Sequence, residues 1–99
     1  MKSLAIEIRN PSGLHARPAA LFVRAAAAYR STIRVRNMTR TGELVDAKSI
    51  LGVLGLGVSR GHVLELVAEG DDEVTAIAGL DELIRSGLGE SLGADAGHG

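Results

Sequence analysis

The sequence predicts an α+β domain in which a four-stranded antiparallel sheet is covered on one face by three helices. Two short segments alternate apolar and polar residues, two more are half apolar, and three others repeat apolar residues at helical spacing. These segments follow one another in the order β-α-β-β-α-β-α, and strands with one apolar face need a layer of helices to bury it. We expect one domain over residues 1–88 and a flexible, glycine-rich tail over residues 89–99.

The first half of the chain is predicted to form two strands and one long helix. Leucine and isoleucine alternate with polar residues over 3–9, which indicates a strand with one buried face. Turn-forming residues at 10–13 end this strand. Apolar residues then recur every three or four positions over 16–29, in an alanine-rich segment typical of a helix. A second strand follows at 32–36, with arginines on its outer face.

The second half is predicted to contain two more strands and two helices. Residues 43–46 form a short strand that pairs with the second strand as a hairpin. Cap-type residues then introduce a short helix over about 47–55. The fourth strand covers 62–68 and is expected to run centrally in the sheet. The last helix begins with the acidic residues after Gly70, where the helix dipole favours negative charge, and ends near Ser86.

The composition excludes several classes of protein. Eleven basic residues against twelve acidic ones, with one tyrosine and one phenylalanine, offer nucleic acid neither net charge nor stacking surface. The absence of cysteine excludes disulfides and thiolate sites and favours the cytoplasm. No apolar run suggests a signal peptide or direct membrane insertion. The histidines at 15, 62 and 98 lack metal-ligand spacing, so we expect neither metal nor cofactor.

Residues 13–18, Gly-Leu-His-Ala-Arg-Pro, bring a histidine and an arginine to the start of the first helix. Pro18 suits a first helical turn, and a helix N-terminus attracts anions through its free N–H groups. The guanidinium of Arg17 adds a planar charged fork for phosphate or carboxylate. The neutral imidazole of His15 is a nucleophile that can form a phosphoramidate. On these residues alone, His15 either caps the helix or accepts a phosphoryl group, and both interpretations remain open.

Ser49, at the start of the short helix, also has two interpretations. Its hydroxyl suits an N-cap, which is the ordinary function of serine there. Alternatively it is phosphorylated, which would put about two negative charges beside apolar residues of the helix. A helix this short cannot bury every apolar residue, so we expect some of them to join the first helix in a docking patch. The residues expected there are Ala20, Leu21, Ile50, Leu51 and Leu54.

At three places the chain resembles the HPr family, the histidine-containing phosphocarriers of the bacterial phosphoenolpyruvate-dependent sugar phosphotransferase system. Residues 13–20 (GLHARPAA) resemble its phosphohistidine signature, and residues 47–53 (AKSILGV) resemble its serine-site segment. Residues 68–73 (AEGDDE) resemble the start of its last helix. The resemblance extends from residue 2 to about residue 87, and it implies an open-faced β-sandwich.

The resemblance also implies roles for individual residues. His15 would take a phosphoryl group on Nδ1 from phosphorylated enzyme I and pass it to enzyme IIA domains, with Arg17 as the phosphate partner. Ser49 would be the target of the HPr kinase/phosphorylase, and a transcriptional regulator would be a further partner. The chain would be a monomeric carrier without small-molecule turnover of its own. The expected docking residues are Ala16, Ala20, Leu21, Arg24, Lys48, Ile50, Leu51 and Leu54.

Two other functions remain open. One is a regulatory or nitrogen-branch module that acts mainly by protein binding, with phospho-Ser49 creating the interaction surface. The other is a docking protein that binds anions at the first helix without covalent chemistry. A hydrolase is not expected, because a triad needs an oriented base and residues 10–18 contain no carboxylate to orient His15.

Overall fold

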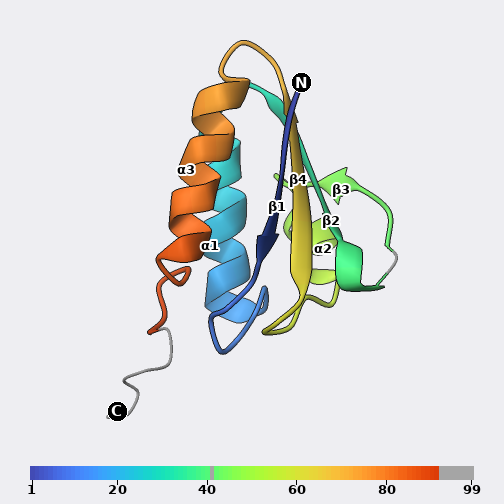
Figure 1. The fold of residues 1–99 in the computed structure, drawn as a ribbon, viewed down its shortest axis with the longest axis vertical. Helices are drawn as coiled ribbons and strands as arrows, with labels where there is room; N and C mark the ends of the chain where they lie inside the picture. The colour runs from blue at the N-terminus through green and yellow to red at the C-terminus, as the bar shows by residue number, and fades with distance from the viewer. Residues whose placement is uncertain (41, 92–99) are drawn as a thin grey trace.

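The computed structural model describes residues 1–40 and 42–91, and the strands and α-helices in this part of the chain follow the predicted order, with one additional 3-10 helix after the second strand (Figure 1). The strands are β1 (Lys2–Glu7), β2 (Thr32–Asn37), β3 (Val45–Asp46) and β4 (Val63–Glu69). The helices are α1 (Ala16–Ala27), the 3-10 helix η1 (Met38–Arg40), α2 (Ile50–Leu54) and α3 (Glu73–Arg85).

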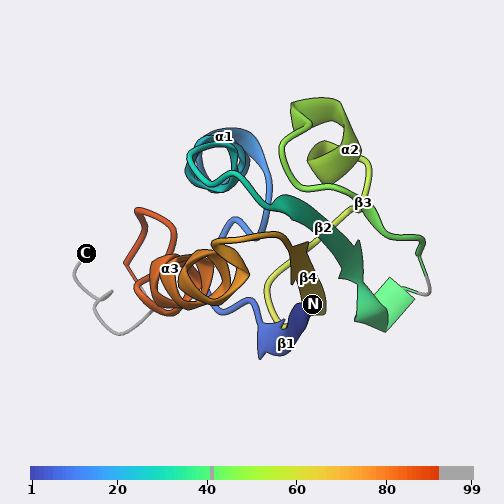
Figure 2. The ribbon, with the colours of Figure 1, turned by 90° about the horizontal axis from the view of Figure 1, so that it is seen from above.

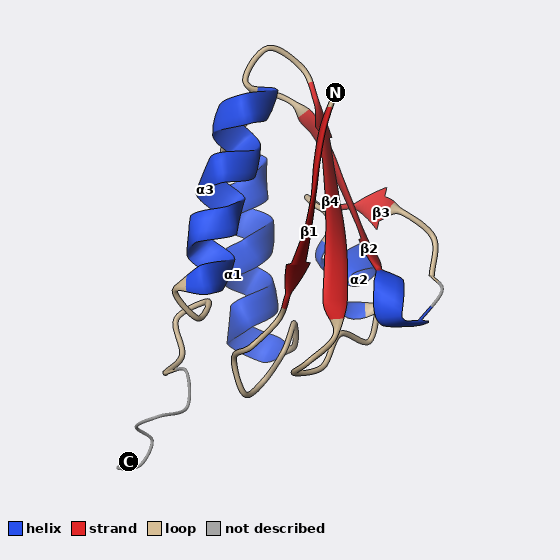
Figure 3. Cartoon of the chain, in the orientation of Figure 1, coloured by secondary structure: helices blue, strands red, loops and turns tan. Residues whose placement is uncertain are grey.

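The four strands form one antiparallel sheet in the order β1-β4-β2-β3 (Figure 3). Strand β4 is central, as predicted: Lys2 of β1 pairs with Ala68, and Ile33 of β2 pairs with the same residue from the other side. Viewed from above, α1, α2 and α3 all lie on one side of this sheet and the other side is bare (Figure 2). The predicted open-faced β-sandwich is therefore confirmed.

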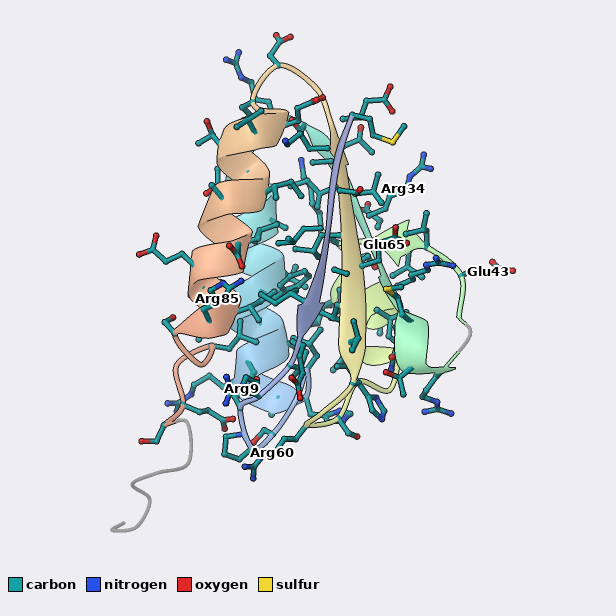
Figure 4. All side chains as sticks on the ribbon, viewed as in Figure 1. Arg9, Arg34, Glu43, Arg60, Glu65 and Arg85 are labelled. Atoms are coloured by element: carbon teal, nitrogen blue, oxygen red, sulfur yellow. The ribbon has the colours of Figure 1, made fainter. Side chains whose placement is uncertain are left out.

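Alternation along the strands explains why only one sheet face is covered. Leu64 and Leu66 of β4 point into the core and are fully buried, and they lie with Phe22 of α1 and Leu80 of α3 in the same apolar cluster. Burial of each such side chain contributes about 1.5–3 kcal/mol. The residues that alternate with the buried ones point to the bare face of the sheet. Arg34 of β2 and Glu65 of β4, labelled in Figure 4, are two of them.

Several elements are shorter than the sequence predicts. Helix α1 ends at Ala27, because the next N–H groups bond to carbonyls three residues back rather than four. Strand β3 has two residues, and only these pair with β2. Helix α2 begins at Ile50, because Ser49 is its N-cap and its hydroxyl accepts a hydrogen bond from the Gly52 N–H at 3.1 Å. Ser49 therefore caps the helix, as the first of its two interpretations predicts.

The chain beyond α3 turns back toward the domain. Leu88 is fully buried in the core, and the Glu90 N–H donates to the Gly87 carbonyl at 2.8 Å. The predicted boundary between domain and tail, after residue 88, falls inside this turn. Residues 92–99 of the predicted tail lie outside the described residues.

Asp72 connects the start of α3 to the segment between α1 and β2. It occupies the N-cap position of α3 without capping that helix through its side chain. Its carboxylate instead accepts hydrogen bonds from the Ser31 hydroxyl, from the Arg30 N–H at 2.8 Å and from the Ser31 N–H at 2.9 Å. These bonds, that of the Ser31 hydroxyl first, lower the pKa of Asp72 from its ordinary value of 3.8 to about 2.

We expect Asp72→Asn to destabilise the protein at neutral pH and to flatten its acid unfolding. Since the folded pKa lies below the unfolded one, the ionised carboxylate stabilises the fold above about pH 4, and this stabilisation is lost as the pH falls from 3.8 toward 2. The difference between wild type and variant should shrink over that window in urea unfolding. Asp71→Asn, which neutralises the exposed neighbour, is the matched control and should keep the wild-type pH dependence.

Candidate functional site

The turn before α1 is held by hydrogen bonds and close contacts, both within the turn and with the segment around Val58. Asn10 is fully buried, and its side-chain amide donates to the Gly13 carbonyl at 3.0 Å. Gly13 has a φ of +61°, and a Cβ there would clash with the Val58 carbonyl oxygen, so glycine is required. The buried Leu14 donates its N–H to the same Val58 oxygen at 3.0 Å. The backbone that leads into His15 is thus fixed on both sides.

His15 occupies the N-cap position of α1 in an extended conformation, with φ −121° and ψ 158°. Its side chain is exposed and makes no capping hydrogen bond, so the interpretation of His15 as a side-chain cap is wrong. Ala16 follows with a φ of 50°, a left-handed conformation that costs a non-glycine residue about 1–2 kcal/mol. The imidazole is therefore presented beside a helix N-terminus whose N–H groups it does not occupy.

Arg17 lies in the first turn of α1 and is exposed. Within residues 1–40 and 42–91 it takes part in no ion pair. Pro18 next to it is buried, which fits its predicted place in the first helical turn. A nucleophilic imidazole, free helix N–H groups and an unpaired guanidinium at one helix end can accept a phosphoryl group and stabilise its charge.

Glu90 is a residue of this corner that the sequence interpretation missed. Its carboxylate accepts hydrogen bonds from the Asn10 amide at 2.9 Å, the Ser12 N–H at 2.9 Å and the Ser12 hydroxyl at 2.7 Å. The Asn10 bond and then those from Ser12 lower the pKa of Glu90, and the charge of Arg17 contributes in the same direction. No local pattern indicates this contact, because about eighty residues of sequence separate the partners.

The predicted docking residues fall into two groups. On α2, Leu51 is 81% exposed, Ile50 41% and Leu54 38%, and we call these three residues the α2 patch. Helix α1 packs directly beside α2 (Figure 2). It adds two exposed residues, Ala16 and Arg24, and two half-buried ones, Ala20 and Leu21.

Lys48 differs from the other predicted docking residues, because its ammonium is already engaged. Its Nζ donates to the Tyr29 carbonyl oxygen at 2.8 Å, just beyond the end of α1. The Leu21 side chain packs close to Gly89. A Cβ on that glycine would lie 2.8 Å from Leu21 Cδ1. These two side chains therefore support the fold as well as bordering the surface.

The described residues contain no group of three histidine, cysteine, aspartate or glutamate side chains that is suited to a metal ion. His62 is half-buried, and its Nδ1 accepts a hydrogen bond from the Ser59 N–H at 3.1 Å. His98 lies outside the described residues. None of the helices in residues 1–40 and 42–91 has the length and apolar character needed to cross a membrane.

Comparison with known proteins gives consistent matches. The family model described as "PTS HPr component phosphorylation site" matches residues 2–86. A multiphosphoryl transfer protein of Haemophilus influenzae is 47% identical over 87 residues, which are 88% of this chain but 17% of that protein. A phosphocarrier protein HPr of Treponema pallidum is 44% identical over 82 residues, or 82% of this chain and 89% of the relative. The chain therefore spans nearly all of the Treponema relative and a small part of the Haemophilus one.

Among solved structures, HPr-C-His of Thermoanaerobacter tengcongensis matches with a TM-score of 0.86 and 53% sequence identity. The match covers 93% of this chain and 100% of that one. The similarity thus extends over nearly the whole of this chain and all of that one.

Proposed function

Because the chain belongs to the HPr family of phosphocarrier proteins, we propose that it accepts a phosphoryl group on His15 from phosphorylated enzyme I and passes it to enzyme IIA domains in sugar uptake. It acts as a monomer in the cytoplasm and turns over no small molecule itself. The observation that carries the proposal is the exposed imidazole at the N-terminus of α1, which makes no capping bond of its own.

The geometry supports a simple division of labour within the site. The lone pair of a His15 ring nitrogen forms the P–N bond, and the bond between phosphorus and the donor breaks. The phosphoryl oxygens then face the free N–H groups of the first turn of α1, where the helix dipole favours negative charge. Arg17 supplies charge-assisted hydrogen bonds to the same oxygens. Since the site is open to solvent, both protein partners can reach it.

The test is incubation of the wild-type protein with phosphoenolpyruvate and enzyme I. We expect one phosphate per chain, labile in acid, and mapped to His15 by mass spectrometry under neutral conditions. A label on another residue would overturn the assignment of the site. Failure to label at all would favour the alternative in which the chain only binds anions at α1.

We expect Leu51→Glu to weaken docking of both enzyme I and enzyme IIA by about tenfold, because it puts a charge into the centre of the α2 patch. Leu51 is 81% exposed, so stability should change by no more than about 0.5 kcal/mol. Val74→Glu is the matched control, since Val74 is 61% exposed on α3 and outside the patch. Equal loss of affinity in both variants, measured by titration calorimetry, would show that docking does not use this patch.

A second part of the proposal is that phosphorylation of Ser49 regulates docking at the α2 patch. Its half-exposed side chain lies next to the α2 patch, so a phosphoserine would bring about two negative charges beside Ile50. In the alternative function, this modified surface is what partners recognise and transfer on His15 is secondary. A source genome with an HPr kinase and sugar permeases favours the sugar branch, whereas one with only a nitrogen-type chain favours the alternative.

A further inference from the structure

The segment after α3 forms an anchored turn. Leu88 is fully buried, and its N–H donates to the Leu83 carbonyl at 3.1 Å. Gly87, Leu88 and Gly89 have φ values of 101°, 50° and 85°, so three successive residues adopt left-handed backbone. This run reverses the chain and brings Glu90 back toward the turn that precedes His15. Glu90 therefore has a defined position in the structure.

Both carboxylate oxygens of Glu90 are used by that turn. Oε1 accepts from the Asn10 amide and from the Ser12 N–H, and Oε2 accepts from the Ser12 hydroxyl. The Asn10 amide nitrogen donates also to the Gly13 carbonyl, whereas Asn10 Oδ1 has no partner among the described residues. The buried Asn10 side chain is thus held only through its amide nitrogen. An unbroken series of hydrogen bonds runs from Glu90 to Gly13, two residues before His15.

The backbone around His15 needs such support. Ala16 has a φ of 50°, and a left-handed non-glycine residue persists only where its surroundings hold it. On the C-terminal side, the buried Pro18 and Ala19 hold the helix. On the N-terminal side, the turn at residues 10–13 supports this conformation. Glu90 lies outside that turn and accepts hydrogen bonds from two of its residues, Asn10 and Ser12.

We propose that Glu90 is a positioning residue for phosphoryl transfer, because its carboxylate clamps the turn at residues 10–13 and so orients His15 at the start of α1. This inference rests on the proposed function of His15. Displacement of a reacting group by about 1 Å can slow a reaction about a hundredfold. Glu90 acts through Asn10 and Ser12 and does not itself touch the phosphoryl group.

The test is the initial rate of phosphorylation by enzyme I and phosphoenolpyruvate at increasing concentrations of carrier. Glu90→Ala should lower kcat about 10- to 100-fold and leave KM within about twofold, because the α2 patch is intact. Glu90→Gln keeps one carbonyl acceptor for Asn10 and the Ser12 N–H, so it should recover at least half of this loss on a logarithmic scale. Glu82→Ala removes an exposed carboxylate from α3 and is the matched control, with wild-type rates expected.

A double-mutant cycle completes the experiment. Once Ser12→Ala has removed one donor, Glu90→Ala should cost less than it does alone, because the two residues act as one unit. Wild-type kcat in Glu90→Ala, or a loss confined to KM, would overturn the inference while the proposed function stands. Equal losses in Glu90→Ala and Glu90→Gln that follow a lowered Tm would show a purely structural effect and would also overturn it. A wild-type protein that takes no label refutes the proposed function itself.

Discussion

Replacing His15 by alanine is expected to abolish phosphoenolpyruvate-dependent labelling and to leave the fold intact. The loss should be complete, because the variant has no ring nitrogen to form the P–N bond. The His15 side chain is exposed and caps nothing, so its removal should change the free energy of unfolding by no more than about 0.5 kcal/mol. Radiolabel incorporation and urea unfolding measure the two quantities on the same preparation.

His62→Gln is the matched control for this experiment. His62 is half-buried, and its Nδ1 accepts a structural hydrogen bond from Ser59, so we expect the variant to lose some stability and to retain full labelling. If His15→Ala took up as much phosphate as the wild type, the proposed site would be wrong. Chemical stability of the adduct would then identify the residue type that carries it.

Arg17→Glu is expected to slow phosphoryl transfer from enzyme I by about a hundred- to a thousandfold. Loss of one well-placed donor to developing charge costs about this factor, and the new carboxylate also repels the phosphoryl oxygens. Arg17 is exposed and forms no ion pair within the described part of the chain, so stability should be unchanged. Stopped-flow or quenched-flow transfer rates and thermal unfolding test the two statements.

Arg17→Lys separates charge from geometry in the same assay. Lysine keeps the positive charge but lacks the planar fork that binds two phosphoryl oxygens, so its rate should lie between those of wild type and Arg17→Glu. Parallel losses of rate and of thermal stability in Arg17→Glu would mean that Arg17 supports the fold and not the phosphate.

The fold was largely predictable, because its determinants are periodic and local. The apolar positions of the strands and of α1 and α3 mark the face of each element that is buried. In the structure these same positions form the core between the sheet and the helices. The exposed α2 patch was also predictable, since five helical residues cannot turn Ile50, Leu51 and Leu54 all toward the core. Element ends were less predictable, because single hydrogen bonds such as that of Ser49 decide them.

The candidate site was only partly predictable. The motif at residues 13–18 identifies His15 and Arg17, but nothing local distinguishes an imidazole that caps α1 from one that does not. The contacts of Glu90 depend on a turn with three left-handed residues, which no spacing of apolar residues reveals. The sequence likewise indicates Lys48 as a docking residue, but it does not reveal that the Lys48 ammonium donates to the Tyr29 carbonyl oxygen.

The pairing of β1 with β4 has a consequence for folding during synthesis. Lys2 lies opposite Ala68, and within the described residues β1 pairs only with β4, so β1 stays unpaired during synthesis until β4 has also emerged from the ribosome. Contacts so distant in sequence form slowly, and an unpaired apolar strand is exposed to aggregation meanwhile. The corner around His15 is completed later still, because Glu90 follows the last helix. A ribosome-bound chain that lacks this segment would therefore carry the histidine before the turn that orients it is closed.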